Sequence, residues 1–170
     1  MTNSDILEIS LKQSALDLNC CPEDFFRDAP VVVLSRKHPD ARRYLKLPFE
    51  CNLVSYGSNV VASVSQRAEA AVREYLQDGE GYDCFKTPKL HRLDESLAAM
   101  GLMTRHMAEY FLPDMITLRP LSCRFDLRLM GPEDFSDLYV PAWSNALCAD
   151  RRHLDVIGLG AYDGDRKSVV

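Results

Sequence analysis

Residues 124–135 read RFDLRLMGPEDF, and this stretch contains the signals of both a strand and a helix. Apolar and polar side chains alternate over 124–130, which is the pattern of a β-strand with one buried face. The Pro-Glu-Asp at 132–134 suits a first helical turn, because proline needs no hydrogen-bond acceptor there and acids complement the positive end of the helix. The sequence therefore predicts a strand followed at once by a helix, in an α+β (α/β-like) arrangement.

Downstream, we expect a helical stretch around residues 144–153 and a strand over 155–162. Asp163-Gly164 is a typical hairpin turn, so a return strand should follow. Residues 166–170 are too few to pair along the whole of the preceding strand, so we expect that strand to keep an exposed apolar edge. Such an edge is a template for another strand, which either the sheet of the N-terminal module or a second copy of the chain could supply. We favour the second copy, so a homo-oligomer, most simply a dimer, is expected.

Upstream, the chain mixes helices and strands again. The first expected elements are a helix over 4–18 capped by Ser4, a short helix from Pro22, a strand over 30–34 and two strands within 51–64 joined at Gly57. They are followed by a helix from Ser65 closed by Gly79 and Gly81, a helix over 94–100 ended by Gly101, and a strand over 104–112. Residues 114–122 have the composition of a connector. The sequence thus predicts an N-terminal α+β module over 1–115 and a second part over 120–170.

The composition excludes several classes of protein. Of the 170 residues, 46% are hydrophobic and 26% charged, which is typical of a folded globular chain. The net charge of −5 and the lack of a basic stripe argue against a nucleic-acid partner. The basic cluster at 36–43 is interpreted as a solvated turn and helix start, or as an anion site. An acidic N-terminus and the absence of an apolar run of about 18 residues predict no membrane partner and a cytoplasmic protein.

Residues with reactive side chains form no recognisable catalytic or metal-binding set. The six cysteines contain no C-x-x-C pair, so we expect reduced, buried structural thiols. The four histidines show no metal-ligand spacing, so no metal site is expected. Glu23 and Asp24 could act as an acid–base pair, but both also suit the first turn of the Pro22 helix. No catalytic residue can be assigned.

Three segments resemble, in order, the opening of the GNAT acetyltransferase fold: FDLRLMGPEDFSDLY, PAWSNAL and LDVIGLGAYDGDR. Two further segments, SALDLNCCPEDFF and AEYFLPD, resemble the module that precedes the acetyltransferase domain in a group of bacterial GNAT proteins. Together these likenesses cover nearly the whole chain. They imply a bacterial N-acetyltransferase that uses acetyl-CoA, with 120–170 forming the incomplete start of the GNAT domain.

The resemblance also implies what these 170 residues lack. In the family, backbone amides of a Q/R-x-x-G-x-G/A loop between a later strand and helix cradle the pyrophosphate of acetyl-CoA. No such loop occurs here, and Gly158 and Gly160 sit within a strand pattern. We therefore expect a truncated relative that has no cofactor-binding residue, binds no cofactor and is catalytically incompetent alone. An amine substrate is expected only in full-length relatives.

Three residues are candidates for contact with a substrate. Trp143 and Asn145 fall on the link between the first two GNAT helices, which lines the acceptor side in the family. For Trp143 we favour the alternative of packing between modules. Asn19 is either a polar group beside the cleft or the cap of the Pro22 helix. The alternative function is a non-catalytic interaction or small-molecule-binding module that self-associates or pairs with another chain.

Overall fold

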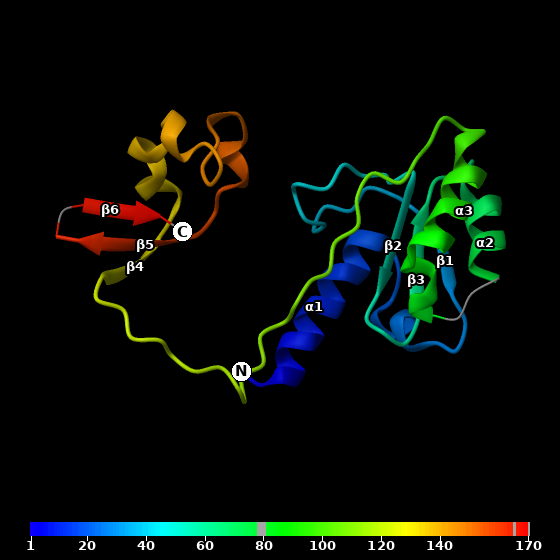
Figure 1. Ribbon diagram of the computed structural model, residues 1–170, viewed down its shortest axis with the longest axis horizontal. Helices are drawn as coiled ribbons and strands as arrows, with labels where there is room; N and C mark the ends of the chain where they lie inside the picture. The colour runs from blue at the N-terminus through cyan, green and yellow to red at the C-terminus, as the bar shows by residue number, and fades with distance from the viewer. Residues whose placement is uncertain (78–80, 165, 170) are drawn as a thin grey trace. The chain divides into compact units, whose positions relative to one another are not determined.

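A computed structural model describes residues 1–77, 81–164 and 166–169 (Figure 1). The chain divides into two compact units, Met1–Leu118 and Arg119–Val170, and each is described by itself. Both contain a three-stranded sheet accompanied by helices. The predicted α+β class is confirmed.

The first unit is built on a mixed sheet with the order β1-β3-β2. β1 (Val31–Leu34) runs parallel to β3 (Val60–Val64), and β2 (Cys51–Ser55) runs antiparallel to it. All five residues of the central strand β3 are buried. The turn between β2 and β3 contains Gly57 at φ 100°, a conformation that favours glycine, so the predicted pair of strands is confirmed.

Helices cover both faces of this sheet (Figure 1). Alternate residues of β3, from Val60 to Val64, pack in a core with α2 (Glu69–Gln77) and α3 (Thr87–Ala98). On the other face, Val61 packs with α1 (Asn3–Leu18) and with Phe25. Burying each large apolar side chain contributes roughly 1.5–3 kcal/mol to the stability of the fold.

The same short sequence, Pro-Glu-Asp-Phe, opens a 3-10 helix in each unit. These helices are η1 (Pro22–Phe26) and η3 (Pro132–Leu138). The backbone N–H of Cys21 donates to Asp24 Oδ2 at 2.9 Å, and that of Gly131 donates to Asp134 Oδ2 at 2.9 Å. The phenylalanine that follows is buried in both cases. Asp24 therefore has the structural role expected of a first-turn acid, while Glu23 is exposed.

Several predicted helix boundaries were wrong. Thr2, not Ser4, caps α1: its Oγ1 accepts from Asp5 N at 3.2 Å, while Thr2 N donates to Asp5 Oδ2 at 2.6 Å. α3 begins at Thr87 rather than 94, because Pro88 fits the first turn of the helix and does not delay its start. The predicted end of the preceding helix at Gly79 lies outside the described residues, and Gly81 begins η2 (Gly81–Phe85).

Two further expectations in the first unit were wrong. Residues 104–112 do not form a strand, because no described strand lies beside them to complete a hydrogen-bonded ladder, and their side chains are mostly exposed. The basic cluster at 36–43 contains no helix start. It lies instead in the long connection between β1 and β2.

The second unit is an antiparallel sheet with the order β4-β5-β6. β4 (Asp126–Met130) and β5 (Gly158–Asp163) are neighbours although 27 residues separate them. That connection contains η3, η4 (Pro141–Trp143) and η5 (Ala149–Leu154). Its apolar side chains form a core with the end of β4: Met130, Phe135, Leu138 and Leu147.

The structure corrects four expectations about this unit. The helical stretch expected at 144–153 is replaced by separate 3-10 turns, because its apolar residues are too few to support a continuous helix. The strand expected over 155–162 begins only at Gly158, and β4 is exposed over four of its five residues rather than half-buried. The return strand does form: β6 (Arg166–Val169) pairs with Gly160–Asp163. β5 is therefore a central strand over Gly160–Asp163, and the uncovered edge expected there was wrong, whereas Gly158 and Leu159 have no partner among the described residues of β6.

Candidate functional site

The second unit holds a pair of polar groups at the edge of its core. Tyr139 follows η3, Asp155 follows η5, and the Tyr139 hydroxyl donates to Asp155 Oδ2 at 2.9 Å. Both residues are partly buried. Loss of hydration raises the pKa of Tyr139, and the hydrogen bond to Asp155 and its negative charge raise it further. The tyrosine therefore keeps its proton and serves as a donor to the carboxylate.

A cation already occupies the face of this tyrosine. The guanidinium carbon of Arg152 lies 4.6 Å from the centroid of the Tyr139 ring. A cation at this distance is attracted by the electrons of the ring face. Tyr139, Arg152 and Asp155, here called the Tyr139 corner, thus combine an aromatic face, a carboxylate and a bound positive group.

The sequence-predicted residues Trp143 and Asn145 belong to the same connection. Trp143 is partly buried and packs, like Tyr139, against the core of this unit. Asn145 is exposed, and its backbone carbonyl accepts from Arg151 Nη2 at 3.3 Å. The structure therefore places Trp143 on the same core as Tyr139, whereas the only bond described for Asn145 is made by its backbone.

Asn19 belongs to the first unit and does not cap the Pro22 helix, so that prediction was wrong. It ends α1 in the left-handed conformation, at φ 62°, which asparagine tolerates better than most residues. Its Oδ1 accepts from Arg36 N at 2.5 Å, which ties the end of α1 to the chain after β1. Asn19 and Arg36 also line a hollow of about 320 Å³ with Val33 and Leu34.

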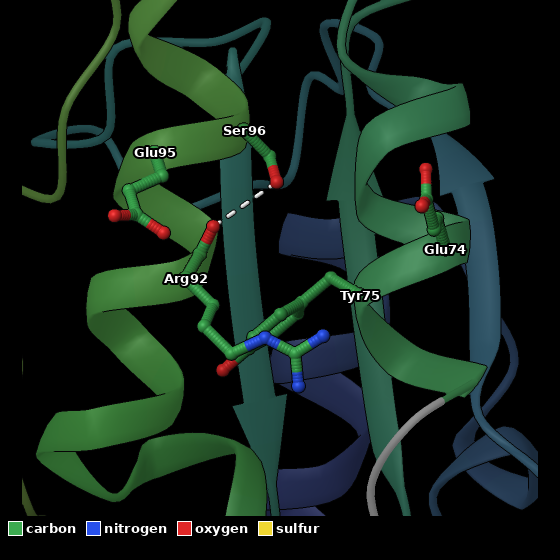
Figure 2. Close-up of a pocket in the computed structure, with 5 residues that line it drawn as sticks. All are labelled: Glu74, Tyr75, Arg92, Glu95 and Ser96. Atoms are coloured by element: carbon green, nitrogen blue, oxygen red, sulfur yellow. Dashed lines mark hydrogen bonds between the residues drawn. The ribbon is translucent and has the colours of Figure 1, made fainter.

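A second hollow, also of about 320 Å³, lies between α2 and α3 (Figure 2). Both hydroxyl groups that line it already donate hydrogen bonds to backbone carbonyls. Tyr75 donates to the carbonyl of Cys84, and Ser96 donates to the carbonyl of Arg92 at 3.0 Å. Burial raises the pKa of Tyr75 to about 12. Neither hydroxyl is activated for nucleophilic chemistry. The remaining lining residues are Glu74, Arg92 and Glu95.

The described residues contain no group of three or more His, Cys, Asp or Glu side chains arranged to hold a metal ion. The thiols are poor nucleophiles where they are buried: burial raises the pKa of Cys51 to about 12 and, with the charge of Asp83, that of Cys84 to about 11. The expectation of buried thiols was wrong for Cys21 and Cys123, which are exposed. Within the part of the chain that the structure describes, no helix is long and apolar enough to cross a membrane.

None of the three residues of the Tyr139 corner was predicted from the sequence. Tyr139 and Asp155 are 16 residues apart, and nothing in the local sequence indicates that they meet. Arg152 reads as one of several consecutive charges in a basic run. The partnership arises from the return of the chain to β5, which a local pattern does not specify.

Comparison with known proteins gives no assignment, because no family model, curated protein or solved structure matches this chain.

Proposed function

We propose that residues 119–170 form the acceptor-binding start of a GNAT-type N-acetyltransferase, with the first unit as its accessory module. The proposal rests on the resemblance in sequence and on the Tyr139 corner. In relatives, the acetyl-CoA site is made by a later strand and helix. The segments that resemble the family all belong to the part that precedes that site, so the 170 residues are not expected to transfer an acetyl group alone.

The observation that carries the proposal is the Arg152 guanidinium over the Tyr139 ring, next to Asp155. A primary amine is protonated near neutral pH and carries the same charge as the guanidinium. It would gain the interaction with the ring face that Arg152 makes, and also an attraction to the Asp155 carboxylate. Before transfer, such an amine must lose a proton to a base, and no residue of this chain is assigned that role.

The test uses Trp143, which is the only tryptophan and packs on the same core as Tyr139. Titration with a polyamine such as spermidine should change its fluorescence in a saturable way. Asp155→Asn keeps an acceptor for the Tyr139 hydroxyl but removes the charge, and should weaken binding. Arg152→Gln removes the competing cation and should tighten binding about two- to tenfold.

The matched control is Asp150→Asn, which removes an exposed carboxylate from η5, the helix that precedes Asp155. It should bind the amine as the unchanged chain does. If Asp155→Asn and Asp150→Asn behave alike, or if Arg152→Gln weakens binding, the Tyr139 corner is not the amine site. A fluorescence change that never saturates would also count against the proposal.

A further inference from the structure

β4 has one edge that is paired and one that is open. β5 pairs with one side of the strand, and in the described part of this unit no strand pairs with the other. An open edge presents backbone N–H and C=O groups in the geometry that another strand requires. The sequence along this edge is Asp126-Leu127-Arg128-Leu129-Met130.

One face of the sheet beside this edge is apolar. The register places Leu129 opposite Leu159 and Leu127 opposite Ala161, so these four side chains lie on the same face. The leucines are largely accessible: Leu127 is 48%, Leu129 74% and Leu159 44% exposed. Met130, which points to the other face, belongs to the core. The accessible leucines therefore form a surface that would gain from being covered.

The charges on β4 determine which strand would fit. Asp126 and Arg128 alternate with the leucines, their side chains are mostly exposed, and Arg128 Nη2 lies 2.7 Å from Asp126 Oδ2. Like charges along an edge would repel a second copy. Opposite charges two residues apart are instead self-complementary, because antiparallel pairing about a two-fold axis reverses their order.

The position of that axis can be derived. With Leu127 on the axis, Asp126 of each copy lies opposite Arg128 of the other, and Leu127 lies opposite its own counterpart. With Arg128 on the axis, two guanidinium groups face each other, and with Asp126 on the axis, two carboxylates do. Cross-strand pairs of opposite charge are favourable and those of like charge are not. The alternation of charges selects the register centred on Leu127.

We infer that β4 pairs antiparallel with β4 of a second copy of this chain, with Leu127 on the two-fold axis. The two three-stranded sheets then become one continuous sheet with its leucines on one face. This inference does not depend on the proposed acetyltransferase relationship. A dimer was also expected from the sequence, with β5 as the contact. Because β5 is a central strand, we place the contact at β4 instead.

The dimer should be weak. Stable interfaces bury about 800 Å² on each partner, and a patch of three leucines beside a five-residue strand offers less than that. We therefore expect the monomer to prevail at low micromolar concentration and the dimer to appear as the concentration rises. Sedimentation equilibrium of the full chain over a wide concentration range measures this directly.

Charge reversals test the register. Arg128→Asp places carboxylates opposite carboxylates, and Asp126→Arg places guanidinium groups opposite one another, so each variant should raise the dimer dissociation constant by about tenfold or more. A mixture of the two variants restores both attractive pairs and should form a heterodimer. The double reversal within one chain should dimerise like the original. Arg105→Asp, at an exposed position outside β4, is the control with the same change of charge and should have no effect.

Two results would overturn the inference. One is a chain that remains monomeric at all concentrations, and the other is a dimer that both single reversals leave intact. Should a reversal disturb folding, amide hydrogen exchange of the unchanged chain still decides the matter. Exchange of the outward N–H groups of β4 must slow as the protein concentration rises, and exchange that is independent of concentration would exclude pairing at this edge.

Discussion

Asp17 binds Arg42 across 25 residues of sequence. The carboxylate, 3% exposed at the end of α1, accepts from the backbone N–H of Arg42 at 2.9 Å, and Arg42 Nη1 lies 3.0 Å from its second oxygen. Gln13 also donates to Asp17 at 3.1 Å. This one buried acid therefore fixes the long connection between β1 and β2 against the first helix.

Replacing Asp17 by Ala should cost about 1–3 kcal/mol of unfolding free energy, because the backbone N–H of Arg42 loses its acceptor and the guanidinium loses its ion-pair partner. Urea unfolding of the two proteins measures the difference. Asp28→Ala removes an exposed carboxylate from the same region and is the control, with an expected change within about 0.5 kcal/mol. Equal losses in the two variants would mean that the buried pair has no special role.

Both Pro-Glu-Asp-Phe turns should be weakened by the loss of their capping acid, and the first one more, because Asp24 is buried and also pairs with Arg27 whereas Asp134 is exposed. Asp24→Ala and Asp134→Ala each remove the acceptor for a backbone N–H and should cost about 0.5–2 kcal/mol. The neighbouring exposed acids provide matched controls, Glu23→Ala and Glu133→Ala, which should change little. Thermal unfolding followed by circular dichroism compares the four. Larger losses in the glutamate variants would refute the capping role.

Alkylation of the thiols should follow their burial. Cys21 and Cys123 are exposed and should react with iodoacetamide first. Cys51 and Cys84 should react slowly at pH 8, because burial raises the pKa of Cys51 to about 12 and that of Cys84 to about 11, which leaves little thiolate. Mass spectrometry of timed samples gives the order of modification. Rapid reaction of Cys51 in the folded chain would contradict this account.

Acid should destabilise the first unit. Hydrogen bonds from Arg67 lower the pKa of Glu50, and the backbone N–H of Thr104 lowers that of Asp94. A carboxyl group whose pKa is depressed by folding stabilises the fold above its unfolded pKa of about 4 and loses that contribution as pH falls further. The melting temperature should therefore fall below about pH 4, and less steeply for Glu50→Gln. A melting temperature that does not change with acid would be inconsistent with these interactions.

Patterns confined to a few neighbouring residues were predicted well from the sequence. The turn at Gly57 and both Pro-Glu-Asp starts were found, because glycine at positive φ and acids in a first turn act locally. The strand expected over 104–112 failed for the opposite reason. Its apolar residues suit a strand, but a strand requires a neighbouring strand, and local sequence does not reveal whether one is present.

The candidate site depended on long-range contacts. Trp143 was selected through the family resemblance, while Tyr139, Arg152 and Asp155 were missed because their contact forms only when the chain returns to β5. A paired return strand was not expected, because few residues follow the turn at Asp163-Gly164. The structure shows that the four residues of β6 are enough to pair with the end of β5. The uncovered edge consequently lies on β4.

We propose that residues 119–170 bind an amine as the acceptor side of an acetyltransferase would, and that the 170 residues bind no acetyl-CoA. Parallel NMR titrations of the full chain with spermidine and with acetyl-CoA test it most directly. We predict that spermidine shifts the Trp143 indole N–H and the backbone amides between Tyr139 and Asp155, whereas millimolar acetyl-CoA shifts none of them. Saturable shifts with acetyl-CoA, or spermidine shifts confined to residues 1–118, would contradict the account.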